Sequence, residues 1–167
     1  DVIVATDDER IAKVAAEFCT VEMTRADHST GTDRIAEVAA RLDCDAVVNV
    51  QGDEPLVHPE MLREAVKPFV GDKSIVCSNL LSKICSPQEF HDPNTIKVVI
   101  DKEGYALYFS REPIPTETVQ GFFSNIFLYK QVCIIPFKRK FLLEFASLKP
   151  TLLEVAESID MLRILEN

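Results

Sequence analysis

The chain of 167 residues has no tryptophan, only five glycines and no long hydrophobic run. Nothing in it approaches the roughly 18 to 20 consecutive apolar residues of a membrane-spanning helix, and no signal-peptide pattern stands at its start. No low-complexity tract or internal repeat is present, while 47% of the residues are hydrophobic, enough for one globular core. We therefore expect a soluble, cytoplasmic protein that has no membrane partner.

Positive charge is also scarce, because 18 Lys and Arg residues stand against 27 Asp and Glu residues and give a net charge of −9. A nucleic-acid backbone is bound mainly through lysine and arginine, so nucleic acid is not an expected partner. A small phosphate-bearing ligand stays compatible with this charge. No C-x-x-C pair occurs, and we interpret the cysteines as reduced core residues. They are Cys19, Cys44, Cys77, Cys85 and Cys133.

Three common catalytic and nucleotide-binding motifs are missing. Neither G-x-G-x-x-G nor G-x-x-x-x-G-K-[ST] occurs, so Rossmann dinucleotide binding and P-loop hydrolysis lose their best marker. No G-x-S-x-G is found either, which counts against an α/β-hydrolase.

Both ends of the chain are typical of a piece of a longer protein. Asp1 is followed at once by a strand-like run, and residues 158–167 are an amphipathic helical pattern up to the last residue. If a first parallel strand is missing, an apolar sheet edge is exposed, and we expect the isolated chain to be oligomeric or poorly soluble.

Short apolar runs alternate with helical patterns over the first 70 residues. The runs at 2–6, 21–23 and 46–50 predict strands, and the patterns that follow each of them predict helices, the last at 59–70. This alternation favours right-handed βαβ units and a parallel sheet.

The second half is richer in strand patterns. Residues 74–81, 96–101, 105–110 and 129–137 predict strands, and residues 138–146 and 151–166 predict helices. Gly104 supplies a hairpin turn between two of the strands. With no Gly- or Ser-rich linker, we expect a single α/β domain over residues 1–167, in which mixed strands extend a parallel core.

The first candidate site is the sequence Gln51-Gly52-Asp53-Glu54-Pro55, which directly follows the most apolar strand. Ligands of open α/β sheets bind beyond the carboxyl ends of the strands. Gly52 would permit close approach of the backbone, and the Asp53 carboxylate could bind a Mg²⁺ ion that also takes phosphate oxygens. The alternative is a solvated turn whose acidic side chains only satisfy backbone N–H groups.

The second candidate site is the loop 25–34, where hydroxyl groups and a glycine precede a helix. A helix N-terminus can accept an anion or the edge of a nucleotide. The alternative is an ordinary cap, in which Thr30 or Thr32 caps the helix and Asp33 complements its dipole. Arg34 stands in the first turn, where the dipole disfavours a cation, which indicates a role beyond helix stability.

Two further cations in the β-rich half have less specific signals. Lys97 and Arg111 flank predicted strands, where each could meet an anionic substrate or solvate a strand end.

Several stretches in the same order resemble the CMP-Kdo synthetase family, the 3-deoxy-manno-octulosonate cytidylyltransferases. They are residues 2–11 (VIVATDDERI), 23–38 (MTRADHSTGTDRIAEV), 48–55 (VNVQGDEP), 106–111 (ALYFSR) and 153–163 (LEVAESIDMLR). The resemblance spans nearly the whole chain. It implies a Rossmann-like nucleotide-diphospho-sugar transferase fold.

The resemblance also implies a Mg²⁺-dependent transfer of CMP from CTP to the sugar acid Kdo, which releases pyrophosphate and serves lipopolysaccharide biosynthesis. By motif, Asp53 would bind the metal and take part in catalysis, and Arg111 would act as a catalytic residue that receives the sugar carboxylate. Gln51, Gln131 and Asp160 would contact the substrate. Nucleotide-binding positions would be Thr30, Gly31, Thr32, Asp33 and Arg34.

The chain departs from the family at two kinds of position. The basic N-terminal loop that holds the triphosphate and the later G-V-D-T-P-E-D segment with a second metal ligand have no counterpart in the sequence. On the sugar side, the family's R-H-I-G-[IV]-Y reads Lys130-Gln131-Val132-Cys133-Ile134-Ile135, and its E-Q-L-R reads Asp160-Met161-Leu162-Arg163.

These departures leave three interpretations open. The chain belongs to a Kdo cytidylyltransferase, to a transferase for another acidic sugar, or to a non-catalytic binding module of the same descent. The apolar stretch from Tyr129 to Phe145 is compatible with a homodimer interface and equally with burial in the core.

Overall fold

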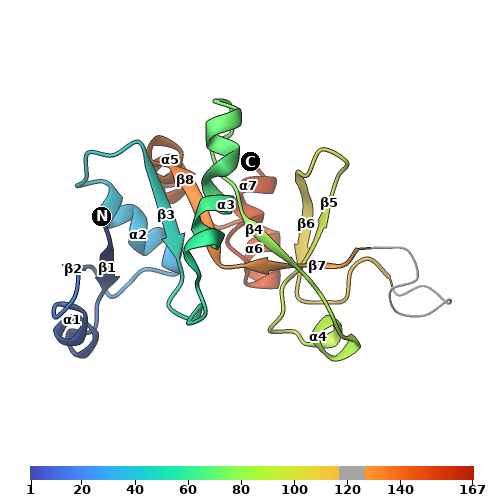
Figure 1. Cartoon of the computed structure of the whole chain (residues 1–167), viewed down its shortest axis with the longest axis horizontal. Coiled ribbons are helices and arrows are strands. Elements are labelled where there is room, and N and C mark those ends of the chain that lie inside the picture. Colours follow the sequence, from blue (N-terminus) through green and yellow to red (C-terminus); the bar gives the residue numbers. More distant parts are fainter. Residues whose placement is uncertain (117–126) are drawn as a thin grey trace.

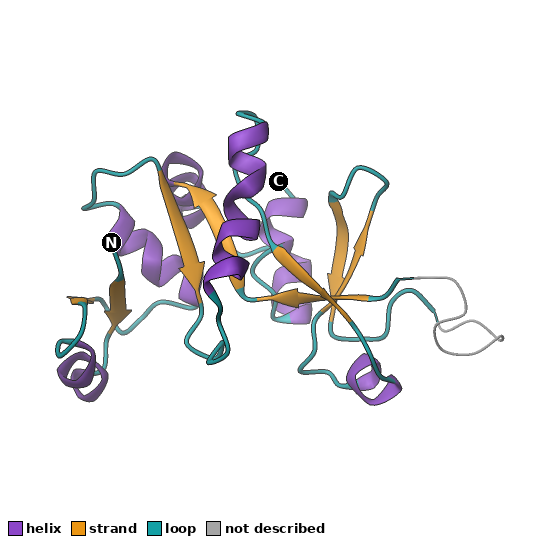
Figure 2. Cartoon of the chain, viewed as in Figure 1, coloured by secondary structure: helices purple, strands orange, loops and turns teal. Residues whose placement is uncertain are grey.

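The computed structural model describes residues 1–116 and 127–167, and within them strands and helices alternate along the chain (Figures 1 and 2). In chain order they are β1 (Ile3–Thr6), α1 (Glu9–Ala15), β2 (Thr20–Met23), α2 (Gly31–Ala39), β3 (Ala46–Val50), α3 (Pro59–Gly71), β4 (Leu80–Lys83), α4 (Pro87–His91), β5 (Lys97–Ile100), β6 (Ala106–Ser110), β7 (Tyr129–Val132), β8 (Ile134–Lys138), α5 (Arg139–Ser147), α6 (Leu152–Glu157) and α7 (Leu162–Leu165). This confirms the α/β class.

The strands form separate pairs and one larger sheet. β1 and β2 pair in parallel, as the alternating pattern predicted. β3 instead pairs antiparallel with β8, and the remaining strands form an antiparallel sheet in the order β4-β7-β5-β6. Among the described residues, the predicted parallel pairing is therefore confined to β1 and β2, because a strand from the second half of the chain occupies one edge of β3.

Two predicted elements are each broken in two. The strand expected at 129–137 divides at Cys133 into β7 and β8. The helix expected at 151–166 divides into α6 and α7, because Ser158 adopts a left-handed conformation with φ 54° and ends the first of them. Periodicity alone does not reveal such breaks, since the apolar pattern continues through both of them.

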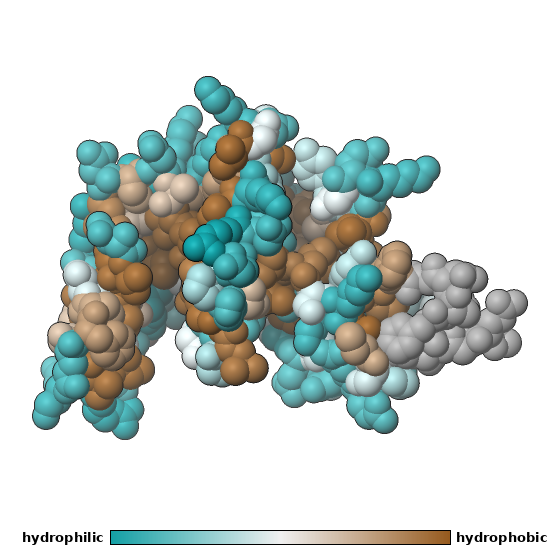
Figure 3. Space-filling model, in the orientation of Figure 1, coloured by the Kyte–Doolittle hydropathy of each residue, from teal (hydrophilic) through white to brown (hydrophobic). Residues whose placement is uncertain are grey.

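Helix α1 exposes most of its apolar side chains. Ala15 is its only buried residue, whereas Ile11 and Val14 are 52% and 60% exposed, and Phe18 in the turn that follows is 74% exposed. Figure 3 shows apolar surface at the end of the molecule that holds α1. The helix itself was predicted correctly, but its apolar face is not buried against the rest of the described chain.

The main core joins α2, β8, α5 and α7 to the β5–β6 hairpin. In the stretch proposed as an interface, the side chains of Ile135, Phe137, Leu142 and Phe145 are completely buried in this core. Burial therefore accounts for the apolar character of that stretch, and the homodimer stays a prediction.

All the cysteines are free, but their predicted place in the core is wrong in part. Cys85 is exposed and the other four are only partly buried. No helix among the described residues is long and apolar enough to cross a bilayer.

Candidate functional site

A cavity of about 340 Å³ lies beyond the carboxyl ends of β1 and β3, beside the start of α2. It brings together five of the residues that the sequence singled out, namely Gly31, Arg34, Gln51, Gly52 and Asp53. The other lining residues are Ala5, Ile35, Asn49 and Val50. The expectation that functional side chains gather where these strands end thus agrees with the geometry.

The loop after β3 is fixed to the break between β7 and β8. The Gln51 N–H donates to the Cys133 carbonyl at 3.1 Å, and the Cys133 N–H donates to the Glu54 carboxylate at 2.8 Å. A further bond of 3.1 Å runs from the Glu54 N–H to the Gln51 carbonyl. Glu54 is therefore engaged in holding the turn, which leaves Asp53 at its tip.

Asp53 is exposed, and its carboxylate makes no hydrogen bond or ion pair with the described residues. The neighbouring Gly52 adopts no left-handed conformation, and a Cβ on it would meet no atom within 4 Å. Close backbone approach by the protein therefore does not explain this glycine, and the space beside it is open. A lone carboxylate next to open space suits Mg²⁺, which takes one or two carboxylates together with phosphate oxygens and water.

No group of three or more metal-binding side chains occurs in the part of the chain that the structure describes. Burial, with the Asp53 and Glu54 carboxylates nearby, raises the pKa of the Cys133 thiol to about 12. This thiol is therefore protonated at neutral pH and is not a nucleophile.

The start of α2 has the ordinary helix cap that was the alternative interpretation of the loop 25–34. Thr30 Oγ1 accepts a hydrogen bond from the Asp33 N–H at 3.1 Å and donates to the Asp33 carboxylate at 2.8 Å. Burial alone would raise the pKa of Asp33, but hydrogen bonds from Arg163, Thr30 and Ser29 outweigh it and hold the pKa below its usual value.

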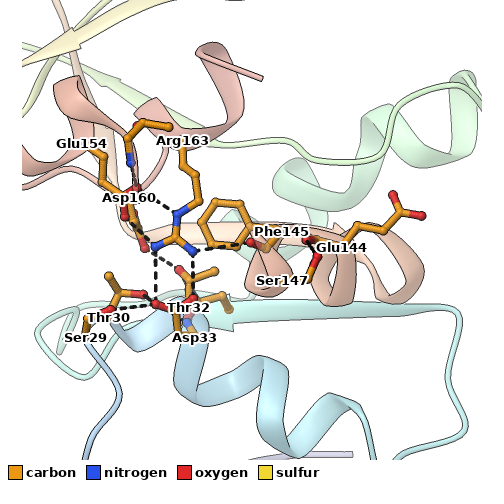
Figure 4. Close-up of polar contacts among 12 residues, drawn as sticks. Ser29, Thr30, Thr32, Asp33, Glu144, Phe145, Ser147, Glu154, Asp160 and Arg163 are labelled. Carbon is orange, nitrogen blue, oxygen red and sulfur yellow. Dashed lines mark hydrogen bonds and ion pairs between the residues drawn. The ribbon is translucent and has the colours of Figure 1, made fainter. Parts of the chain in front are cut away.

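Arg163 ties this capped loop to the C-terminal helices (Figure 4). Its guanidinium, 2% exposed, lies 3.0 Å from an Asp33 oxygen and 2.5 Å from a Glu154 oxygen, and it stands over the Phe145 ring. The sequence motifs did not pair Arg163 with Glu154 or Asp33. Arg163 falls at the end of the stretch that matches the family's E-Q-L-R, but nothing in the sequence marks its partners.

Thr32 and Asp160 lie behind the cavity as a hydrogen-bonded pair. The completely buried Thr32 donates to Asp160 at 2.6 Å and accepts from Asn49 at 3.3 Å. Burial raises the pKa of Asp160, and the hydrogen bond from Thr32 opposes that rise only in part. Asn49 was not predicted, although a lone amide in an apolar strand is a recognisable signal.

Arg111 lies in a second cluster, at the end of β6. Its guanidinium donates to the carbonyls of Glu157, Pro93 and Ser158 at 2.7, 3.0 and 3.2 Å. The Nζ of the fully buried Lys97 donates to three carbonyls as well, one of them that of Arg111. Both cations therefore satisfy strand and loop ends, and neither lines the cavity of Arg34 and Asp53.

Gln131 lies on β7, where its side-chain amide donates to Asn79 at 2.6 Å. It does not line the cavity either. The predicted residues thus fall into four groups. They are the cavity set, the capping residues Thr30 and Asp33, the hydrogen-bonded pair behind the cavity, and Arg111 and Gln131 at the antiparallel sheet.

Comparison with known proteins decides which family has this arrangement. The family model described as cytidylyltransferase matches residues 1–167. The 3-deoxy-manno-octulosonate cytidylyltransferase of Geobacter metallireducens is 51% identical over the whole chain, which covers 69% of that relative. The chain belongs to the cytidylyltransferase family. Another relative, from Chloroherpeton thalassium, carries the same name and is 42% identical, with 68% of its length covered.

A solved member of the cytidylyltransferase family has the same fold. The structure of CMP:2-keto-3-deoxy-manno-octonic acid synthetase complexed with CTP matches 99% of this chain and 68% of its own, with a TM-score of 0.88 and 35% sequence identity. The cytidylyltransferase fold, a nucleotide-sugar transferase fold, is therefore present in residues 1–167.

Proposed function

We propose that this chain acts as a 3-deoxy-manno-octulosonate cytidylyltransferase, which transfers CMP from CTP to Kdo, releases pyrophosphate and supplies CMP-Kdo for lipopolysaccharide biosynthesis. The observation that carries the proposal is the cavity that joins Arg34, Gln51 and Asp53, in a chain 51% identical to a relative of that name. A cytoplasmic location belongs to the same proposal, since the five free thiols fit a reducing compartment.

The reaction forms a bond between the anomeric oxygen of Kdo and the α-phosphorus of CTP. It breaks the bond between that phosphorus and the oxygen that leaves with pyrophosphate. Such a transfer needs alignment and charge neutralisation more than covalent work by the protein. We assign Asp53 as the carboxylate that holds Mg²⁺, which when bound would neutralise charge on the phosphates. Its exposure and lack of a protein partner support this role.

The start of α2 is assigned to the nucleotide. Gly31 and Arg34 face the cavity, Thr30 and Asp33 shape the capped turn, and Thr32 fixes the first turn from behind. Gln51, whose side chain makes no hydrogen bond to the described residues, is assigned to the substrate on the other side of the cavity.

Arg111 is assigned to the sugar carboxylate. A guanidinium has five N–H groups, and three of those of Arg111 are used on backbone carbonyls. The remaining two have no partner among the described residues and suit the two oxygens of a carboxylate. Asp160 and Gln131 are assigned to the same substrate.

The test is pyrophosphate release from CTP and Kdo with Mg²⁺, measured for the chain, for Asp53→Asn and for Asp43→Asn. Asp43 is exposed at the opposite end of β3, so Asp43→Asn removes the same charge at a place away from the cavity. We expect Asp53→Asn to lower turnover by at least about a hundredfold, since metal stabilisation contributes several kcal/mol. Asp43→Asn should leave turnover unchanged.

A hybrid is assayed in parallel, in which the Geobacter metallireducens relative supplies the part of its length that this chain does not match. Turnover in neither protein, or equal turnover in both aspartate variants, contradicts the proposal. CTP binding without turnover would instead support the non-catalytic interpretation.

A transferase for another acidic sugar is the second candidate. Ile135, which replaces the family's tyrosine, is completely buried, and Gln131, which replaces its histidine, is bound to Asn79. Both changes fall where the family resemblance would place the sugar. Faster turnover with N-acetylneuraminate than with Kdo in the same assay would favour this candidate.

A further inference from the structure

The Arg34 side chain is held where two parallel strands end. Asp7 directly follows β1 and Thr24 directly follows β2. The Arg34 Nη1 atom lies 3.0 Å from the Asp7 Oδ1 atom, 2.5 Å from the Thr24 hydroxyl and 3.1 Å from the Arg25 carbonyl. One nitrogen of the guanidinium thus donates to Thr24 and Arg25 and forms an ion pair with Asp7.

The opposite edge of the same guanidinium makes no hydrogen bond to the described residues. This edge consists of Nε and Nη2, and Arg34 lines the cavity together with Gln51 and Asp53. Because a guanidinium is planar and rigid, fixing Nη1 also fixes the direction of the Nε–Nη2 edge. That edge is a fork of parallel donors suited to two acceptor atoms of a ligand.

Asp7 is not explained by stability alone. Its side chain is 37% exposed, and an ion pair at this exposure contributes only about 0 to 1 kcal/mol. In a chain of net charge −9, a further carboxylate beside a cavity proposed to bind an anionic nucleotide also opposes ligand binding by simple repulsion. Its benefit must therefore come through Arg34.

We propose that Asp7 is a positioning residue, which orients the Nε–Nη2 edge of Arg34 toward bound CTP. The inference rests on the proposed function and adds to it a residue that contacts no ligand. Positioning and electrostatics predict opposite signs when the Asp7 charge is removed. If Asp7 acts only through its charge, Asp7→Asn should tighten binding of an anionic nucleotide. If Asp7 positions Arg34, the same substitution should weaken binding.

The experiment measures the dissociation constant of CTP by calorimetry for the full chain and for Asp7→Asn, Asp8→Asn, Arg34→Ala and Asp7→Asn/Arg34→Ala. Asp8 is the matched control, since it pairs with the exposed Arg10 and caps α1, a task that asparagine performs equally well. We expect Asp7→Asn to weaken CTP binding about tenfold, as loss of an orienting partner typically does. Asp8→Asn should not weaken it, and Asp7→Asn should add no weakening once Arg34 is alanine.

Thr24→Val provides a second test, because it removes one acceptor of the same nitrogen and keeps a β-branched side chain in place. It should weaken CTP binding in the same direction as Asp7→Asn, while the unfolding midpoint of each variant serves as the control for folding. The inference is overturned if Asp7→Asn leaves CTP binding unchanged or tightens it, or if Asp7→Asn weakens binding equally in the presence and absence of the Arg34 side chain. Either result leaves the proposed function standing. If the unaltered chain and the hybrid both fail to bind CTP, the proposed function falls and the inference with it.

Discussion

The cavity at the ends of β1 and β3 and the end of the antiparallel sheet at β6 use charged side chains in opposite ways. In the cavity, the Asp53 carboxylate and one edge of Arg34 have no partner among the described residues. At the sheet end, Lys97 and Arg111 are directed onto six backbone carbonyls. The first region leaves charge free for a ligand, whereas the second uses most of its donors to fix its own backbone.

A third cluster consists of Arg163, Asp33 and Glu154. Its ion pairs join α2 to the C-terminal helices (Figure 4). The three clusters predict different losses of stability when one partner is removed. Those losses also test whether the two regions are as different as their contacts indicate.

The largest loss is expected for Arg163→Met. Removing this guanidinium leaves the carboxylates of Glu154 and Asp33, 7% and 15% exposed, without their cation. Breaking such a buried pair typically lowers the free energy of unfolding by about 3 to 5 kcal/mol. Urea unfolding measures it, with Arg41→Met as control, because Arg41 is half exposed and its pairs should contribute less than about 1 kcal/mol. Equal losses in the two variants would show that the cluster is not stabilising.

Lys97→Met should have the next largest effect and should act on the sheet region. It leaves the carbonyls of Thr95 and Arg111 without a donor, while the Asp92 carbonyl keeps only the Thr95 N–H, at a cost of about 2 to 3 kcal/mol. Lys102→Met, in the exposed hairpin turn, is the control and should be neutral. If Lys97→Met also abolished CTP binding by the folded protein, the two regions would not be independent.

The pKa values of Asp33 and Asp160 shift in opposite directions, which predicts opposite contributions to the dependence of stability on pH. The pKa of folded Asp33 is lowered, so its contribution is present above the unfolded pKa and is lost as the pH falls through the folded value. The pKa of Asp160 is raised, so its ionised form opposes folding at neutral pH, and this penalty disappears as the pH falls.

Unfolding of Asp33→Asn and Asp160→Asn from pH 7 down to pH 3 separates the two cases. At pH 7, Asp33→Asn should lose about 1 to 2 kcal/mol, whereas Asp160→Asn should stay within about 1 kcal/mol of the parent or exceed it. Both differences should shrink toward pH 3. A large loss at pH 7 in Asp160→Asn would contradict the direction of its pKa shift.

The sequence predicted the cavity better than the sheet region, for a physical reason. In a βα unit, the residue after a strand has a fixed place at the sheet edge, so Gln51–Pro55 and the start of α2 could be brought together from their positions alone. The residues that meet Arg111 could not be found in this way. Its partners at 157 and 158 depend on how α6 ends, which is set by the left-handed Ser158, and its partner at 93 lies in the loop between α4 and β5.

The hydrophobic pattern of the sequence also could not predict which distant strands pair with each other. An apolar run such as β3 suits a parallel or an antiparallel neighbour equally well, and only the fold places β8 against it. The family resemblance supplied what periodicity did not, because it carried the order of motifs over the whole chain. It did not supply Asp7, whose contact with Arg34 depends on the geometry of two strand ends.

An effect no larger than that of Asp33→Asn is expected at the far end of the sheet region, for Gly104→Ala in the β5–β6 turn. Gly104 has φ +91°, which an L-residue adopts at a cost of about 1 to 2 kcal/mol, although a Cβ there would meet no other atom. Gly71→Ala, at the end of α3 without a positive φ, is the matched control and should be neutral or slightly stabilising. Thermal unfolding measures both, and CTP affinity should be unchanged in each, since a strained turn in the antiparallel sheet has no path to the Arg34 and Asp53 cavity through the contacts described. A loss of affinity in Gly104→Ala alone would show that the sheet region also sets the geometry of the nucleotide cavity.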